Sequence, residues 1–258
     1  MISVLWTSDR ALVVDKTPGV LVHNSAWAGP REETVTSLLR AQLGVPVVPM
    51  HRLDRGTSGV CAFAVAAEHV SCVRLGATKA YVALVRGRPA QPVDIEHGLD
   101  DDDVKGSPRR AARSRLEPLL SSSVERVSVV GLVLFSGRRH QARRHCKHVS
   151  HPIVGDATHG KGALNRDLRD RYGLSRLCLH AAALSIDDAA GEARPSPPTG
   201  VIVRAPLPND WHAPLAALFP GDDVAAVVDR WLTQWSAALS TSLPDEPEGN
   251  DDAQEHAG

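Results

Sequence analysis

The chain has 258 residues, a formal net charge of −1 and a hydrophobic fraction of 43%. This length allows one large domain or two small ones, and no apolar run approaches the roughly 20 residues that cross a membrane. The first residues carry neither a charged leader nor a cleavable apolar core, so we expect a cytoplasmic protein. The four cysteines show no C-x-x-C spacing and do not predict a disulfide framework.

Charge is distributed unevenly along the chain. From Pro244 onward there are six acidic residues and no Lys or Arg, which predicts a disordered acidic tail over residues 244–258 after a folded domain over residues 1–243. No acidic residue occurs between Arg126 and Gly155, a segment that holds six basic ones: Arg126, Arg138, Arg139, Arg143, Arg144 and Lys147. This pattern favours an anionic partner, nucleic acid ahead of a membrane, although a solvated basic helix would share it.

Hydrophobic patterns and turn residues predict the elements in the first third of the chain. In chain order they are a strand over residues 11–14, a strand ending at His23 after the Pro18-Gly19 turn, a helix over residues 33–43 ended by Gly44, a strand over residues 60–65, a helix over residues 66–75 and a strand over residues 79–87. Tyr81 stands near the start of the last of these strands.

The remaining elements are predicted in the same way. Residues 89–118 are the least interpretable stretch. Within them the charged arm over residues 100–115 is expected to be a solvent-facing loop that either binds RNA phosphate or neutralises itself. The segments that follow are a hairpin or bent strand over residues 124–135 interrupted at Gly131, a short helix over residues 139–149, strands over residues 177–186 and 201–204, and a helix with one apolar face over residues 224–239.

The stretch His51–Gly59 reads H-R-L-D-R-G-T-S-G and stands between two prolines and a buried strand. Its carboxylate, Asp54, is flanked by Arg52 and Arg55, and nearby positive charge favours the ionised form. An ionised Asp on a tight turn beside a rigid strand can attack carbon. A solvated ion-pair cluster at the end of a strand is the alternative interpretation.

Three segments together carry a family resemblance. H-R-L-D-R-G-T-S-G, K-A-Y-V-A-L-V-R-G and G-R-R-H-Q-A-R-R-H-C-K-H-V-S-H-P-I-V-G-D resemble the three ordered motifs of the RluA-type pseudouridine synthases, and D-K-T-P-G-V-L-V-H resembles their opening hairpin. The resemblance covers residues 10–185. The H-x-x-S-H-P-I-x-G-D-x-x-H-G arrangement, followed by Asn165-Arg166, is closest to the branch called tRNA pseudouridine synthase C.

This resemblance implies a fold and an active site. The fold would be a single α/β (α+β) domain with a central, mostly antiparallel mixed sheet flanked by helices. Asp54 would be the catalytic carboxylate, Arg143 would pair with it and keep it charged, and Tyr81 would stack on the target base and help to remove the C5 proton. No cofactor is needed, and attack at C1′, attack at C6 and a glycal route all stay open. Ala142 and Cys146 replace bulkier aliphatic residues of the family and predict a looser wall around the arginine.

The resemblance also implies how RNA would be bound. Arg52 would occupy the space that the extruded base leaves, and the other RNA-binding residues would be Arg55, Arg138, Arg139, Arg144 and Lys147. The branch resemblance favours tRNA, in the stem that leads to the TΨC loop, with ribosomal RNA as the competing substrate. We expect a monomer.

Two alternatives come from other functional classes. A zinc-dependent hydrolase could use His140, His145, His148, His151, Asp156 and His159. The intervening Arg and Lys residues oppose a dication, which argues against this site. The second alternative is a non-catalytic RNA-binding module that retains the fold and binds RNA without converting it.

Overall fold

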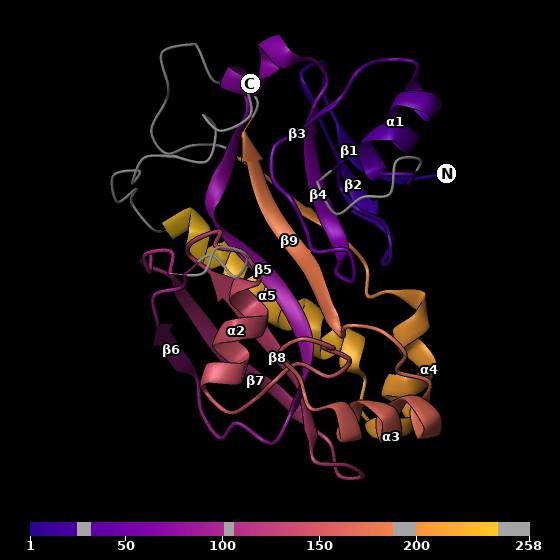
Figure 1. Ribbon diagram of the computed structural model, residues 1–258, viewed down its shortest axis with the longest axis vertical. Helices are drawn as coiled ribbons and strands as arrows, with labels where there is room; N and C mark the ends of the chain where they lie inside the picture. The colour runs from indigo at the N-terminus through magenta and orange to yellow at the C-terminus, as the bar shows by residue number, and fades with distance from the viewer. Residues whose placement is uncertain (25–31, 101–105, 188–199, 242–258) are drawn as a thin grey trace.

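The computed structural model describes residues 1–24, 32–100, 106–187 and 200–241 (Figure 1). Its strands form one sheet in the order β1-β2-β4-β9-β5-β8-β7-β6, with β10 paired to β9 and β3 paired to β4. The strands are β1 (Ser3–Thr7), β2 (Ala11–Lys16), β3 (Val48–Pro49), β4 (Ser58–Ala64), β5 (Arg74–Arg86), β6 (Val93–Glu96), β7 (Arg113–Ser121), β8 (Val127–Leu134), β9 (Leu179–Asp187) and β10 (Val201–Arg204).

The sheet is mixed and mostly antiparallel, as predicted. Among its pairs of named strands only β4 and β9 run parallel, and they are paired at Ser58–His180 and Gly59–Ala181. Every residue of β4 and of β8 is buried, so both faces of the sheet are covered at its centre. This burial explains why these two strands have almost continuous apolar sequences instead of alternating ones.

Helices flank the sheet. They are α1 (Val35–Leu43), the 3-10 helix η1 (Ala67–Cys72), α2 (Gln141–His148), α3 (Gly162–Tyr172), α4 (Asn209–Leu218) and α5 (Val224–Thr241). The predicted helix before Gly44 is confirmed: Thr34 caps its start and Gly44, at φ 72°, ends it in the left-handed conformation. None of the helices in the described ranges is long and apolar enough to cross a bilayer.

Helices α2 and α5 lie on opposite faces of the sheet (Figure 1). Ser114 on β7 contacts α2 and is paired with Leu134 on β8. Glu117 accepts a hydrogen bond from Trp231 of α5, and its partner in β8 is Gly131. Since successive residues of a strand point to opposite faces, the face that carries Ser114 is the one that α2 covers.

Gly131 does not interrupt β8. A Cβ atom at this position would lie 2.3 Å from the ring of Trp231, so the glycine lets α5 pack directly on the strand. Of the two predictions for residues 124–135, a hairpin or a bent strand interrupted at Gly131, the strand is present as β8, whereas the hairpin and the interruption are wrong. Glycine was interpreted as a break in the backbone, whereas its function here is close approach of a helix.

Three other predictions of secondary structure are wrong. The solvent-facing loop predicted over residues 100–115 is wrong at its end, because β7 begins at Arg113 and pairs antiparallel with β6, a strand that was not predicted. The helix predicted over residues 66–75 is only the turn η1, and β5 already begins at Arg74. The strand ending at His23 is a single bridge between Leu21 and Thr34. Leu21 and β6 obtain their backbone partners from outside their own segments, which a local pattern does not reveal.

The predicted acidic tail over residues 244–258 lies outside the described residues, and so does part of the charged arm, residues 101–105. The described part of that arm contains the bridge between Leu99 and Arg110, which leads into β7. Helices α3 and α4 and strand β1 were not predicted.

Candidate active site

Asp54 lies on the turn that leads into β4. The turn closes with a hydrogen bond from the Thr57 amide to the Asp54 carbonyl at 3.0 Å. His51, three residues before Asp54, is held against β4, because its Nε2 accepts a hydrogen bond from the Ala62 amide at 3.1 Å. Gly59 adopts φ +108°, and a Cβ there would be 2.1 Å from the carbonyl oxygen of Ala181. Glycine at position 59 therefore allows β4 and β9 to meet directly behind the turn.

Lys16, the last residue of β2, holds the turn that carries Asp54. Its side chain is fully buried, and its Nζ donates to the carbonyls of Thr17 at 2.9 Å, Arg55 at 3.2 Å and Thr57 at 2.8 Å. Burial lowers the pKa of Lys16 to about 8, and the negative charge of Asp54 opposes that shift. This lysine thus connects the end of β2 to the backbone on both sides of the Gly56 position.

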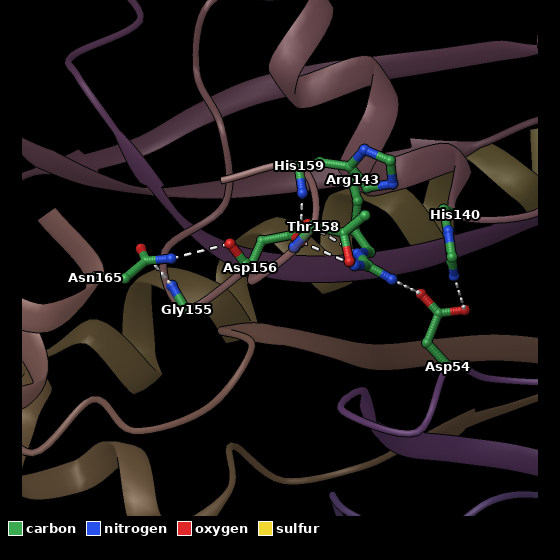
Figure 2. Close-up of polar contacts among 8 residues, drawn as sticks. All are labelled: Asp54, His140, Arg143, Gly155, Asp156, Thr158, His159 and Asn165. Atoms are coloured by element: carbon green, nitrogen blue, oxygen red, sulfur yellow. Dashed lines mark hydrogen bonds and ion pairs between the residues drawn. The ribbon is translucent and has the colours of Figure 1, made fainter. Parts of the chain in front are cut away.

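Arg143 joins two carboxylates (Figure 2). Its Nη1 donates to Oδ2 of Asp54 at 3.0 Å, while its Nε and Nη2 donate to Oδ2 and Oδ1 of Asp156 at 2.8 Å each. The Asp54 side chain is 23% exposed, whereas that of Asp156 is fully buried. The predicted pairing of Asp54 with Arg143 across 89 positions is present, and Asp54 keeps an accessible edge.

Asp156 is held by the loop around it. Its Oδ1 accepts the amides of Thr158 at 3.0 Å and His159 at 2.9 Å. The Asn165 side chain donates to the Asp156 carbonyl and accepts from the Gly155 amide, both at 2.9 Å (Figure 2). Burial would raise the pKa of Asp156, but the hydrogen bonds from Arg143 and from these amides lower it overall. Asp156 therefore stays ionised beneath the guanidinium.

Helix α2 presents Arg143 because its first residue is anchored to β7. The buried side chain of Gln141 donates to the Arg113 carbonyl and to Ser114 Oγ, both at 2.9 Å, and its Oε1 accepts the Arg138 amide at 3.0 Å. The raised pKa of Arg143 reflects its two carboxylate partners, which outweigh the opposing effect of burial. The guanidinium is permanently charged.

His140 adds a second group that faces Asp54. It precedes α2 in the left-handed conformation, at φ 53°, which is uncommon for a residue with a side chain. Its Nε2 lies 3.9 Å from Oδ1 of Asp54, on the oxygen that Arg143 does not contact (Figure 2). The other neighbour of its ring is the His159 ring, in a T-shaped arrangement with centroids 5.5 Å apart.

Tyr81 lies on the same face of the sheet as α2. It is paired with Leu132 of β8, and Leu132 is in turn paired with Leu116, two residues after Ser114. Its side chain is 7% exposed. Burial raises the pKa of Tyr81 well above the ordinary tyrosine value, and the negative charge of Asp54 raises it further. The hydroxyl is therefore neutral at physiological pH and within electrostatic range of the carboxylate.

The predicted RNA-binding residues differ in their surroundings. Arg52 and Lys147 are exposed, and Arg138 and Arg139 are half-buried. The Arg138 Nε donates to the Ala111 carbonyl at 3.2 Å. Two others are engaged by acids, since Arg55 pairs with Glu32 and Arg144 pairs with Asp100. Their charges are therefore partly neutralised within the protein.

The zinc alternative gains no support from the side-chain positions. Within the described ranges no three His, Cys, Asp or Glu residues gather as metal ligands. Asp156 is occupied by Arg143. His145 bonds to Ser114 Oγ and the His97 carbonyl at 3.0 Å each, and His151 bonds to the Arg86 carbonyl at 2.9 Å.

Comparison with known proteins identifies the family. A family model described as RNA pseudouridylate synthase matches residues 10–148, more than half of the chain. The chain belongs to the RNA pseudouridylate synthase family. The predicted RluA-type membership is thereby confirmed, as is the predicted activity of a pseudouridine synthase, which is an isomerase that modifies RNA.

Several members of this family are similar over most of the chain. The tRNA pseudouridine synthase C of Vibrio vulnificus is 33% identical over 235 residues, covering 82% of this chain and 93% of that protein. The protein of the same name from Haemophilus influenzae is 35% identical over 208 residues, 72% of this chain and 87% of its own. The solved structure of human RNA pseudouridylate synthase domain containing 1 has a TM-score of 0.66 at 26% identity, covering 95% of this chain and 97% of that one.

Sequence reasoning missed two residues that this pseudouridine synthase places around Asp54. Lys16 was given no role of its own, and nothing in a sequence marks a lysine that will be fully buried. Asp156 was considered only as a zinc ligand. A signal was available for it, because an Asp three residues before His159 in a glycine-bounded loop is typical of a carboxylate that caps backbone amides.

Proposed function

We propose that this pseudouridine synthase modifies a uridine of tRNA, in the stem that leads to the TΨC loop, with Asp54 as its catalytic carboxylate. The tRNA assignment is supported by the relatives named tRNA pseudouridine synthase C, which are 30–35% identical to this chain. The observation that carries the catalytic assignment is the hydrogen bond from Arg143 to Asp54 in a site that retains an accessible carboxylate edge.

The reaction breaks the bond between N1 of uracil and C1′ of ribose and forms a bond between C5 and C1′. The proton on C5 is released, N1 gains a proton, and no electrons are transferred. An ionised carboxylate suits this chemistry, as nucleophile or as the base that starts a glycal route. The permanent charge of Arg143 keeps Asp54 ionised when RNA covers the site and excludes water.

Tyr81 is proposed to position the base. Its hydroxyl interacts electrostatically with Asp54, and because it is neutral it favours stacking and hydrogen bonding over acting as a phenolate base. Reaching a base in a stem requires extrusion, which costs a few kcal/mol. The exposed Arg52, two residues before Asp54, is proposed to fill the vacated space.

Phosphate contacts are proposed for the basic side chains around the site: Arg55, Arg138, Arg139, Arg144 and Lys147. The acidic partners of Arg55 and Arg144 would be exchanged for phosphate when RNA binds. RNA of a stem would be recognised through its backbone shape as much as through base edges.

The test uses RNA labelled with tritium at C5 of uridine, because formation of pseudouridine releases this label. We expect the wild-type protein to release label from an unmodified tRNA transcript, and Asp54→Asn to bind that transcript without releasing any. Residual turnover by Asp54→Asn would disprove its role. Release from ribosomal RNA fragments but not from tRNA would replace the proposed substrate by the competing one, and binding without release by the wild type would indicate the non-catalytic module.

A further inference from the structure

A polar cavity lies along α2 beside the Asp54 site. It has a volume of about 410 Å³ and is lined by His97, Leu99, Arg144, Lys147, His148 and His159, which we call the histidine pocket. The three residues contributed by α2 stand at helical spacings of three and four, so they share one face of the helix. Arg143, one turn before Lys147, binds the two carboxylates.

Two histidines in the wall of the pocket are held in place by neighbouring side chains. The rings of His97 and His148 are stacked, with centroids 3.9 Å apart and planes 21° apart. The backbone of His97 is fixed because its carbonyl accepts a hydrogen bond from the buried His145, whose other ring nitrogen bonds to Ser114 Oγ at 3.0 Å. A stacked imidazole pair on a fixed base is preorganised for a ligand.

The lining of the pocket combines positive charge with imidazole rings. The six described residues that line it include no acid. Asp100 lies next to Leu99 and pairs with Arg144, whose Nη1 also donates to the Asp100 carbonyl at 2.7 Å. Lys147 adds a second positive charge. Several N–H donors in such a lining favour an anion of the phosphate type.

The position of the pocket connects it to the Asp54 site. His159 lines it and also contacts His140 edge to face, and His140 faces Asp54 at 3.9 Å (Figure 2). The same loop supplies the His159 amide that holds Asp156. Two side chains thus separate the pocket from the carboxylate, so an RNA strand that delivers a uridine to Asp54 passes it.

We propose that the histidine pocket binds a backbone phosphate of the substrate RNA, close in sequence to the uridine that enters the Asp54 site. This inference rests on the proposed function. It goes beyond phosphate contacts by surface arginines in two respects. The phosphate would occupy a defined cavity, and the imidazole of His97 would make the contact depend on pH.

The direction of that pH dependence follows from the groups around His97. Burial lowers the pKa of His97, and so do the charges of His148 and Arg144 from α2 and of Arg109 from the segment before β7, while Asp100 raises it. A bound phosphate adds negative charge and favours the protonated form of the His97 imidazole. Binding therefore takes up a proton at His97, and the affinity for RNA rises as pH falls from about 7.5 to about 6.

The test measures the Kd of the full chain for a tRNA transcript by fluorescence anisotropy, at several salt concentrations and at both pH values. The variants are Lys147→Gln, at an exposed position, and His97→Gln, at a half-buried one, and the matched control is Arg230→Gln, an exposed residue of α5 on the opposite face of the sheet. We expect Lys147→Gln to weaken binding about fivefold and to reduce the slope of log Kd against log salt by about one. His97→Gln should lose much of the pH dependence, and the control should bind like the wild type.

Binding by both pocket variants that matches the control at every salt concentration and pH would overturn the inference. Tritium release by the wild type, measured on the same transcript, separates this failure from failure of the proposed function. If the wild type forms pseudouridine while the pocket variants bind normally, the pocket assignment alone is wrong. If the wild type forms none, the proposed function is wrong and the pocket inference that rests on it falls as well.

Discussion

Arg143 holds Asp156 with two hydrogen bonds of 2.8 Å and Asp54 with one of 3.0 Å. The two carboxylates have different surroundings, since Asp156 is fully buried and fixed by backbone amides while Asp54 is partly exposed. Asp156 thus fixes the plane of the guanidinium, and the remaining N–H group points to Asp54. The orientation of the Arg143 guanidinium toward Asp54 therefore depends on Asp156, a residue that does not need to contact the substrate.

The first prediction is that Asp156→Asn reduces turnover more than it reduces RNA binding. The amide cannot accept both hydrogen bonds and leaves the guanidinium with one carboxylate, so we expect a loss of about 10- to 100-fold in the single-turnover rate. Breaking a buried ion pair also costs about 3 kcal/mol of unfolding free energy. The rate is measured at saturating RNA and the stability by urea denaturation.

A surface acid provides the control for this variant. Asp170 of α3 is 65% exposed and pairs with Arg169 at 3.0 Å, so Asp170→Asn should change neither quantity by much. A specific role of Asp156 in orienting Arg143 also predicts that the affinity of Asp156→Asn for tRNA stays close to the wild-type value while its single-turnover rate falls. Equal losses of affinity and rate would leave Asp156 with a structural role only.

The second prediction separates two possible contributions of Tyr81. Its raised pKa means that the phenolate is scarce near neutral pH, so removal of the hydroxyl alone should be tolerated better than removal of the ring. We expect Tyr81→Phe to retain a larger share of the rate than Tyr81→Leu, which loses base stacking worth about 1–3 kcal/mol. Tritium release at saturating tRNA measures both. Equal loss in the two variants would instead assign the contribution to the hydroxyl.

The sequence allowed the central pair of the site to be predicted but not its supports. Asp54 and Arg143 stand in compact motifs, so their meeting could be expected although 89 positions separate them. Lys16 and Asp156 act through burial and through backbone groups of loops, and both properties depend on tertiary packing. His140 faces Asp54 only because the residue before α2 adopts a left-handed conformation.

The same limit applies to the fold. Strands with continuous apolar sequence, such as β4 and β8, are buried on both faces and could be predicted from composition. Strands β6 and β7 lie at one end of the strand order, carry alternating charges and depend on pairing with their neighbours, so their sequences resemble a loop. Gly131 is a case in which a buried strand was predicted with a false interruption. Its structural role is to leave space for the ring of Trp231, a hundred residues later in the chain.

The third prediction concerns Lys16. Methionine at this position retains the length of the side chain but cannot donate, which leaves the carbonyl of Thr17 and the buried carbonyl of Thr57 without this partner. An unsatisfied buried acceptor costs about 1–3 kcal/mol, so Lys16→Met should lower the unfolding free energy by about 2 kcal/mol and reduce turnover through the loosened Asp54 turn. Urea denaturation and tritium release measure the two effects. Normal stability with normal turnover would contradict this account of the turn.

The last prediction is a loss of stability in mild acid that does not depend on the catalytic pair. Burial lowers the pKa of His51 to about 3 and that of His180 to about 4, so both rings are neutral in the folded protein. His51 Nε2 accepts the Ala62 amide, and His180 Nδ1 bonds to Ser58 Oγ at 3.0 Å. Protonation would charge both rings in a buried site.

The sign of the effect follows from proton binding. Between about pH 6.5, the ordinary histidine value, and pH 4, the unfolded chain binds a proton at each of these residues and the folded protein does not. The free energy of unfolding therefore falls as pH decreases, by up to about 1.4 kcal/mol per pH unit for each histidine. Urea denaturation at pH 7.5, 6 and 5 measures this slope. His180→Gln, which keeps a polar side chain that does not titrate, should make the slope shallower, and a stability that stays constant from pH 7.5 to 5 would show that these rings are not buried in neutral form.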